Sequence, residues 1–207
     1  MNKYSILFLL FLFNLIISAS DFKQVFKNLT PDQMPLQFAG NQGVISMGFG
    51  YSYTMFKRNR TTDLMYGYIP ENISGTDLHI FTLKNTIKHD FCKLRDTIII
   101  VATFNLNTIC TISHNTHLMW PDHYPDGYYF TNAFHLQPSI GLEIKMHQDN
   151  HTNISKLSFY SELGILDQHT YHYIKTGRVS LLNSINLSLG CIYSFKNNAT
   201  EIGGKDH

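Results

Sequence analysis

The sequence predicts an all-β protein, an antiparallel up-and-down β-barrel that crosses a membrane after removal of a signal peptide. Three observations lead to this prediction. The chain begins with the layout of an export signal. Several segments alternate large apolar residues with small or polar ones, which is the period of a strand with two unlike faces. The last of these segments ends on an aromatic residue, Phe195.

The first 20 residues contain the three parts of a cleavable secretory signal. Lys3 supplies the positive charge, Ile6 to Ile17 form the apolar run, and Ser18 to Ser20 are the small residues before Asp21. The apolar run is 12 residues long, whereas a helix that crosses a bilayer needs about 20. We therefore expect cleavage after Ser20, with a retained N-terminal anchor as the alternative.

Composition limits the partners of the chain. The formal net charge is +1 and no run of like charge occurs, so the electrostatic footprint of a nucleic-acid-binding protein is missing. Mean hydropathy is -0.12, and no later apolar run has helix-spanning length, which excludes a helical membrane protein. A barrel is still allowed, because only every second residue of its strands faces lipid. We expect no cofactor.

The mature chain divides into three parts by its pattern. Residues 21–42 are expected to be a lead-in segment, 43–195 the barrel, and 196–207 a polar tail. Seven strands are predicted, at 43–53, 64–69, 78–88, 97–106, 135–146, 155–165 and 187–195. Barrels of this class close with an even number of strands, so an eighth is expected at 36–40 or at 171–180.

The first three strands each have one apolar face. In 43–53, Ile45, Met47 and Phe49 alternate with small residues, which suit the crowded interior of a narrow barrel. A polar turn is expected at 57–62, before the strand that contains Tyr66. In 78–88 the apolar residues alternate with threonines and lysines.

The fourth strand and the segment after it fit this pattern less well. Residues 97–106 are apolar on both faces, as in a strand buried on both sides, which favours a secreted soluble β-sandwich as an alternative fold. Residues 107–134 have no clear period and are rich in aromatic residues. A loop of this length is usually functional or disordered, and we favour a functional loop.

The strands at 135–146 and 155–165 carry charges on their polar faces. In a barrel those faces line the lumen, where enclosing a charge costs less when it is paired. We therefore expect Glu143 and Lys145 to pair with Lys156 and Glu162 of the next strand. The predicted lumen-facing charges are Lys84, Glu143, Lys145, Lys156 and Glu162.

The terminal strand has the most diagnostic pattern. Its apolar face consists of Leu187, Leu189, Cys191, Tyr193 and Phe195. Outer-membrane barrels commonly end with such an alternation and a closing Phe, which is similar to the signal that their insertion machinery recognises. Twelve further residues follow Phe195, which departs from that pattern. Tyrosines at strand ends are placed as in an aromatic girdle at the lipid headgroups.

Several segments together resemble a family of small outer-membrane barrel proteins from bacteroidete-type Gram-negative bacteria. They are VISMGFGYSY (44–53), LMYGYIP (64–70), SGTDLHIFTLK (74–84), YPDGYYF (124–130), YSELG (160–164) and LSLGCIYSF (187–195). The resemblance implies a place in the cell outer membrane, with outer-membrane lipids and the insertion machinery as partners. It carries no established activity.

The sequence contains only weak evidence for a catalytic site or a metal site. Ser113 with His114, and His135 with Ser139, are the nearest pairs of a hydroxyl and a base, but neighbours on a strand point to opposite faces. No His-x-Ser triplet of the lipid A deacylase type occurs. The histidines of the 107–134 segment lie among turn signals, where solvated histidines are the rule, so no metal site is predicted. Catalytic residues stay unknown.

Three cysteines in an oxidising compartment leave at least one unpaired. Cys92 and Cys110 flank one predicted strand, and a disulfide between them is an open alternative, although a strand holds its two ends apart. The function expected from the sequence is a structural or surface-interaction role in the outer membrane. The alternatives are a lipid-modifying hydrolase in the same membrane and a soluble binding protein.

Overall fold

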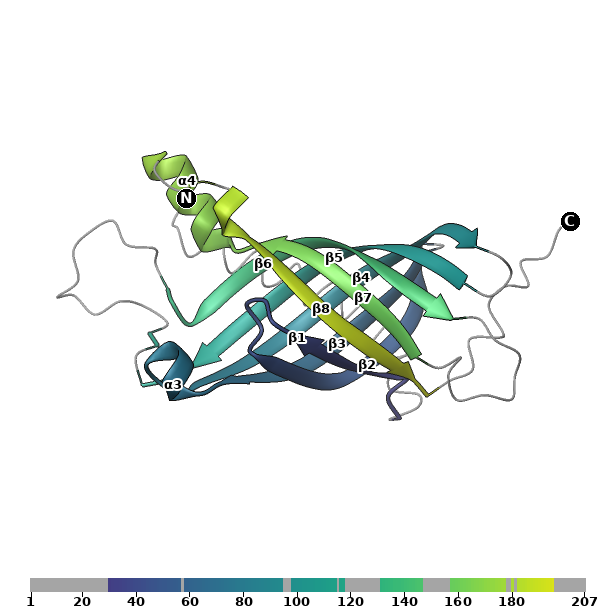
Figure 1. The fold of residues 1–207 in the computed structure, drawn as a ribbon, viewed down its shortest axis with the longest axis horizontal. Helices are drawn as coiled ribbons and strands as arrows, with labels where there is room; N and C mark the ends of the chain where they lie inside the picture. Colours follow the sequence, from purple (N-terminus) through teal and green to yellow (C-terminus); the bar gives the residue numbers. More distant parts are fainter. Residues whose placement is uncertain are drawn as a thin grey trace, which may run out of the picture.

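The computed structural model describes residues 30–56, 58–94, 98–114, 116–117, 131–146, 157–177, 180 and 182–195. Eight antiparallel strands form one closed barrel in sequence order, and β8 pairs back with β1 (Figure 1). The strands are β1 Gln33–Phe38, β2 Ile45–Met55, β3 Arg58–Ile69, β4 Leu78–Leu94, β5 Ile98–Ile112, β6 Phe134–Met146, β7 Leu157–Ile165 and β8 Ile185–Ser194. The prediction of an eight-stranded up-and-down barrel is confirmed.

The eighth strand is β1, so the first of the two predicted positions is the right one. The barrel begins at Gln33, inside the segment expected to be a lead-in. The first three residues of β1, 33–35, precede the predicted position, because they include Pro35 and proline is rare within strands. The other candidate, 171–180, is not a strand, since Tyr171 lies in helix α4 (Asp167–Thr176).

Three strands are longer than predicted, and one of them, β4, continues past Lys88 to Leu94. The turn expected at 57–62 is wrong, because β3 begins at Arg58 and only two residues separate it from β2. Strand β5 continues to Ile112 and so takes in the first part of the segment expected to be a loop. Polar residues misled the prediction for β3 and β5. The interior of the barrel is itself polar, and Thr61 and Asn107 are buried there.

Burial in the barrel is the reverse of that in a water-soluble protein. Along the strands, most inward positions carry small or polar side chains and most outward positions carry large apolar ones. Met65, Ile80 and Ile109 are buried apolar exceptions. Buried inward residues include Ser46, Thr61, Asp63, Thr82, Lys84, Thr86, Thr103, Asn105, Gln137, Ser139, Glu143, Ser158, Glu162 and Ser188. Exposed outward residues include Met47, Phe49, Leu64, Phe81, Phe104, Ile140, Leu142, Phe159, Leu163, Leu187 and Leu189.

The run that is apolar on both faces, 98–106, belongs to β5. There Val101 is fully buried and Phe104 is exposed, so the strand has one face inside the barrel and the other outside. Val101 pairs with Glu143 across the β5–β6 register. The apolar Ile99 and Val101 on the inward side therefore account for the double-faced pattern, and the strand is not sandwiched between two sheets.

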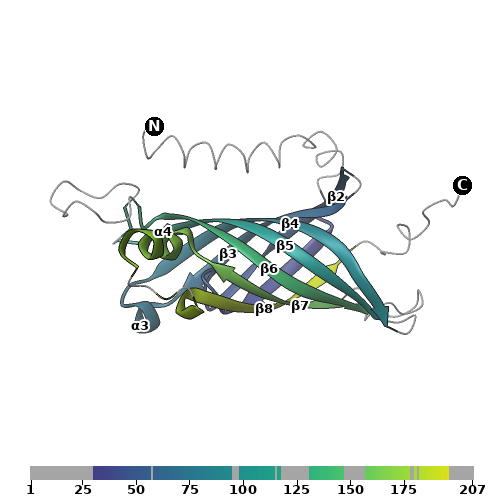
Figure 2. The same ribbon diagram turned by 90° about the horizontal axis from the view of Figure 1, so that it is seen from above.

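The two ends of the barrel differ. We call the end where β1 begins and β8 finishes the termini end, and the opposite one the loop end. Connections at the termini end span residues 56–57, 95–97 and 147–156, whereas those at the loop end span 39–44, 70–77, 113–133 and 166–184. Helices α3 (Glu71–Ser74) and α4 both lie at the loop end (Figure 2). No helix in the described ranges is long and apolar enough to cross a bilayer.

Candidate functional site

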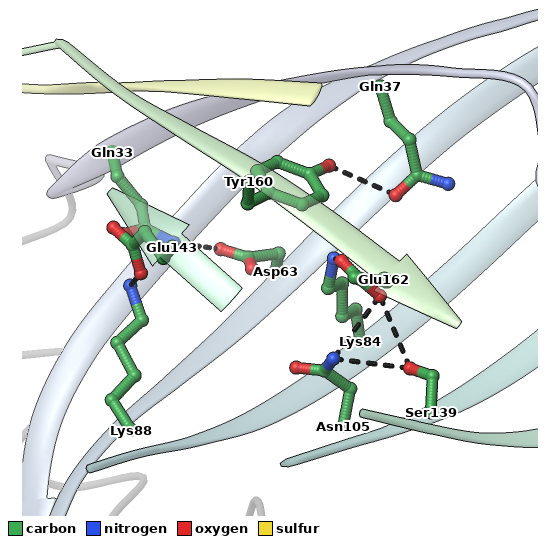
Figure 3. Close-up of polar contacts among 10 residues, drawn as sticks. All are labelled: Gln33, Gln37, Asp63, Lys84, Lys88, Asn105, Ser139, Glu143, Tyr160 and Glu162. Atoms are coloured by element: carbon green, nitrogen blue, oxygen red, sulfur yellow. Dashed lines mark hydrogen bonds and ion pairs between the residues drawn. The ribbon is translucent and has the colours of Figure 1, made fainter. Parts of the chain in front are cut away.

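A network of polar side chains fills the middle of the barrel (Figure 3). We call it the interior network. It takes residues from six of the eight strands, and their side chains converge because alternate positions on every strand point to the barrel axis. Its members are Gln33, Gln37, Asp63, Lys84, Lys88, Asn105, Ser139, Glu143, Tyr160 and Glu162.

Glu162 is the most connected member of the interior network. One carboxylate oxygen forms an ion pair with Lys84. The other accepts hydrogen bonds from Asn105 Nδ2 and from Ser139 Oγ, each at 3.2 Å. The Lys84 ammonium also lies 4.4 Å from the centre of the Tyr160 ring, within cation–π range. Each charge of the pair is therefore compensated, as burial requires.

A second ion pair lies nearer the termini end. Lys88 Nζ is 2.9 Å from a carboxylate oxygen of Glu143, and Ser158 Oγ donates to the other oxygen at 2.8 Å. Two hydrogen bonds extend the network to β1. Gln33 Nε2 donates to Asp63 at 2.5 Å, and the Tyr160 hydroxyl donates to Gln37 Oε1 at 3.0 Å. Strands that are not neighbours are thereby joined through the interior.

The interior network leaves almost no empty space. A void lined by Asp63, Lys84, Glu143 and Glu162, among others, has a volume of about 10 Å³. That is about the room that a single water needs. At this level the barrel is closed by its own side chains.

The predicted lumen charges fall in different places. Lys84, Glu143 and Glu162 are buried in the interior, and Lys145 is half-buried two residues from Glu143. Lys156 lies outside the described residues. Among the described residues, Glu143 pairs with Lys88 and Glu162 with Lys84, and both lysines lie on β4, not on the neighbouring strand where a partner was expected. From the sequence alone, pairs are expected between strands that are neighbours in the chain. Strand β4 comes near β6 and β7 only when the sheet curves and closes into a barrel.

Several members of the interior network were not predicted as site residues. Lys88 has a recognisable signal, since it lies four residues from Lys84 on the same face of β4. Asp63 directly follows the segment expected to be a turn, which belongs to β3 from Arg58 onward. Gln33 precedes the predicted strand position 36–40, and Gln37 lies within it but was not predicted to face the interior.

The terminal strand β8 has the predicted faces. Leu187, Leu189 and Phe195 are exposed on the outside, and Cys191 and Tyr193 are half-buried. The rings of Tyr193 and Phe195 are in edge contact at 5.5 Å. Strand β8 pairs with both β1 and β7, so it is the strand that closes the barrel. Recognition of this strand by insertion machinery stays a prediction.

The candidate catalytic pairs have other partners. The Ser113 hydroxyl is 3.0 Å from that of Thr76, and His114 is exposed. Ser139 belongs to the interior network, whereas His135 Nδ1 is 3.2 Å from Asp167 at the start of α4. Asp167 also accepts from the backbone N–H of Leu136 at 2.9 Å, so this contact fixes α4 to the rim of the barrel.

The described residues contain neither a cluster of metal ligands nor a disulfide. In the described ranges no group of three or more His, Cys, Asp or Glu side chains gathers as a metal site. All three cysteines are free. In the β4–β5 register Cys110 lies opposite Phe81, which is eleven residues from Cys92, or more than about 30 Å along the strand. A Cys92–Cys110 disulfide is therefore excluded.

An aromatic cluster lies on the outer face near the loop end. The Tyr66 hydroxyl is 2.8 Å from His79 Nδ1, and the Tyr68 hydroxyl donates to Asp77 at 2.5 Å. That bond and a second one from the Glu71 N–H hold the pKa of Asp77 below its usual value. Rings with one apolar and one polar end suit a boundary between an apolar layer and water.

The fold and the interior network together define a class: a closed, eight-stranded antiparallel β-barrel with a filled polar interior and an apolar outer face. Comparisons with protein-family models, curated proteins and solved structures give no significant match for the chain.

Proposed function

We propose that this chain is an integral outer-membrane barrel with a structural or surface-interaction role. The observation that carries the proposal is the reversed burial, with ion pairs inside the barrel and large apolar side chains outside. Soluble monomers rarely expose apolar patches larger than a few hundred Å². A belt that extends over all eight strands suits contact with lipid, and this argues against the soluble β-sandwich.

The difference between the barrel ends supports an orientation. Bacterial barrels have short periplasmic turns and longer extracellular loops. The shortest connections here, 56–57 and 95–97, are at the termini end, and the longest ones, 113–133 and 166–184, are at the loop end. The loop end therefore faces the outside of the cell and the termini end faces the periplasm.

The filled interior supports a role that does not depend on transport through the barrel. The interior network would have to break two buried ion pairs to admit a solute. Surface interaction is then assigned to the loop end, where α4 is fixed by Asp167 and the aromatic cluster surrounds Tyr66. The hydrolase alternative gains no support from the partners of Ser113 and Ser139.

Cysteine labelling of intact cells tests the proposed orientation. In a variant whose three cysteines are replaced by alanine, Ile73→Cys on α3 and Phe56→Cys at the termini end serve as matched exposed probes. A membrane-impermeant maleimide is expected to label position 73 in intact cells and position 56 only after lysis. Labelling of position 56 alone in intact cells would reverse the orientation, and equal labelling of both would reject it.

A further inference from the structure

A groove on the outer face near the termini end combines an apolar wall with one cation. Its volume is about 190 Å³, and its lining includes Tyr53, Arg60, Asn85, Ile87, Phe104 and Leu106. The register places Arg60, Ile87 and Phe104 side by side on β3, β4 and β5. Asn85 and Leu106 form the next level toward the middle of the barrel. The groove therefore runs along the barrel wall, with its cation toward the termini end.

Arg60 is an unusual residue for this position. It lies on the outward face of β3, on the same side as the exposed Leu64 and Tyr66. Its Nε is buried without a hydrogen-bond partner, and the guanidinium lies 5.9 Å from the centre of the Phe56 ring. An arginine on a lipid-facing surface is costly unless it reaches an anion or the headgroup layer. The Arg60 guanidinium therefore places a hydrogen-bond donor without a partner beside an apolar groove.

Two lining residues, Tyr53 and Asn85, are joined by a short polar ladder on the same outward face. The Tyr53 hydroxyl is 3.1 Å from Thr62 Oγ1, which donates to Asn85 Oδ1 at 2.8 Å. Asn85 is smaller than Ile87, Phe104 and Leu106, its neighbours in the β4–β5 register, and this difference in size leaves room for the hollow. Its volume is several times the share of one water, about 30 Å³, so it has room for a segment of an acyl chain.

We infer that this groove binds one glycerophospholipid of the membrane leaflet at the termini end. Arg60 binds the lipid phosphate, since guanidinium donors match the geometry of phosphate oxygens. One acyl chain lies along Ile87, Phe104 and Leu106. Arg58, two residues away on the same face, adds positive charge toward the rim. The inference rests on the proposed function, because it needs this face of the barrel to lie in a bilayer.

Native mass spectrometry of the full-length mature barrel, refolded in detergent, tests the inference with phosphatidylglycerol as the probe. Wild type is expected to retain one phosphatidylglycerol. Arg60→Gln removes the cation and should weaken retention roughly tenfold, the value of one charged hydrogen bond. Ile87→Trp fills the groove and should do the same. Lys93→Gln removes another exposed cation at the termini end and should leave retention within about twofold of wild type.

Experiments with two further ligands show which part of the lipid the groove recognises. Diacylglycerol with the same acyl chains should bind about tenfold more weakly than phosphatidylglycerol, and inorganic phosphate should not displace the lipid. Equal retention by Arg60→Gln and wild type, equal binding of diacylglycerol, or displacement by inorganic phosphate would overturn the inference. Heat-modifiable migration of each variant checks folding. If the barrel fractionates with the membrane while Arg60→Gln retains lipid as wild type does, this inference fails and the proposed function stands.

Discussion

Replacing Glu162 with leucine is expected to lower the free energy of unfolding by about 3–5 kcal/mol. Glu162 pairs with Lys84 and accepts hydrogen bonds from Asn105 and Ser139. The substitution leaves a buried ammonium, amide and hydroxyl without this acceptor. Losing one partner of a buried pair costs much more than the pair contributes when both are intact, because the remaining charge keeps its desolvation penalty.

A second substitution separates charge from packing. In the Glu162→Leu, Lys84→Met variant both charges are gone, and at least half of the lost stability should return, since apolar replacements of buried pairs are often tolerated. Urea unfolding in lipid vesicles measures both variants. The exposed Glu71 on α3 provides the control, because Glu71→Leu should change stability by no more than about 0.5 kcal/mol. A Glu162→Leu variant as stable as wild type would show that the interior network does not support the fold.

Replacing Leu64 with arginine is expected to cost about 2–4 kcal/mol in a bilayer. Leu64 lies near the middle of β3, is 61% exposed, and is flanked by Phe49 and Leu83 on the neighbouring strands. At that depth an arginine side chain must reach far toward the headgroups or draw water into the apolar layer. In a soluble protein the same exposed position would tolerate arginine within about 0.5 kcal/mol.

Ile73 is the matched control for this experiment. It is 62% exposed, almost the same as Leu64, but it lies on α3 at the loop end. Ile73→Arg should leave the unfolding free energy in vesicles within about 0.5 kcal/mol of wild type. Equal effects of the two substitutions would mean that exposure alone, and not depth in a bilayer, determines the cost.

The outer face of the barrel was predictable from the sequence, whereas the interior pairing was not. Alternation is a local property, so Phe49, Leu142 and Leu189 can be assigned to one face from their neighbours in the chain. The Lys84–Glu162 and Lys88–Glu143 pairs depend on closure, which brings distant strands together. No local pattern contains that information.

The predicted strand boundaries were wrong for a related reason. Polar residues normally indicate turns, but here Thr61 and Asp63 face a polar interior and belong to β3. The same polarity concealed the start of β1, where the inward residue Gln33 is buried. Helix α4 was also missed, since its aromatic and polar sequence has no clear apolar stripe.

Fractionation of cells that express the full chain tests the membrane barrel most directly. Outer membranes, inner membranes and the periplasmic fraction are separated, and each is run on a gel with and without heating. The reversed burial and the closed pairing of β1 with β8 predict recovery in the outer membrane, with a shift in migration on heating. Recovery in the soluble periplasmic fraction, with no shift on heating, would contradict the account.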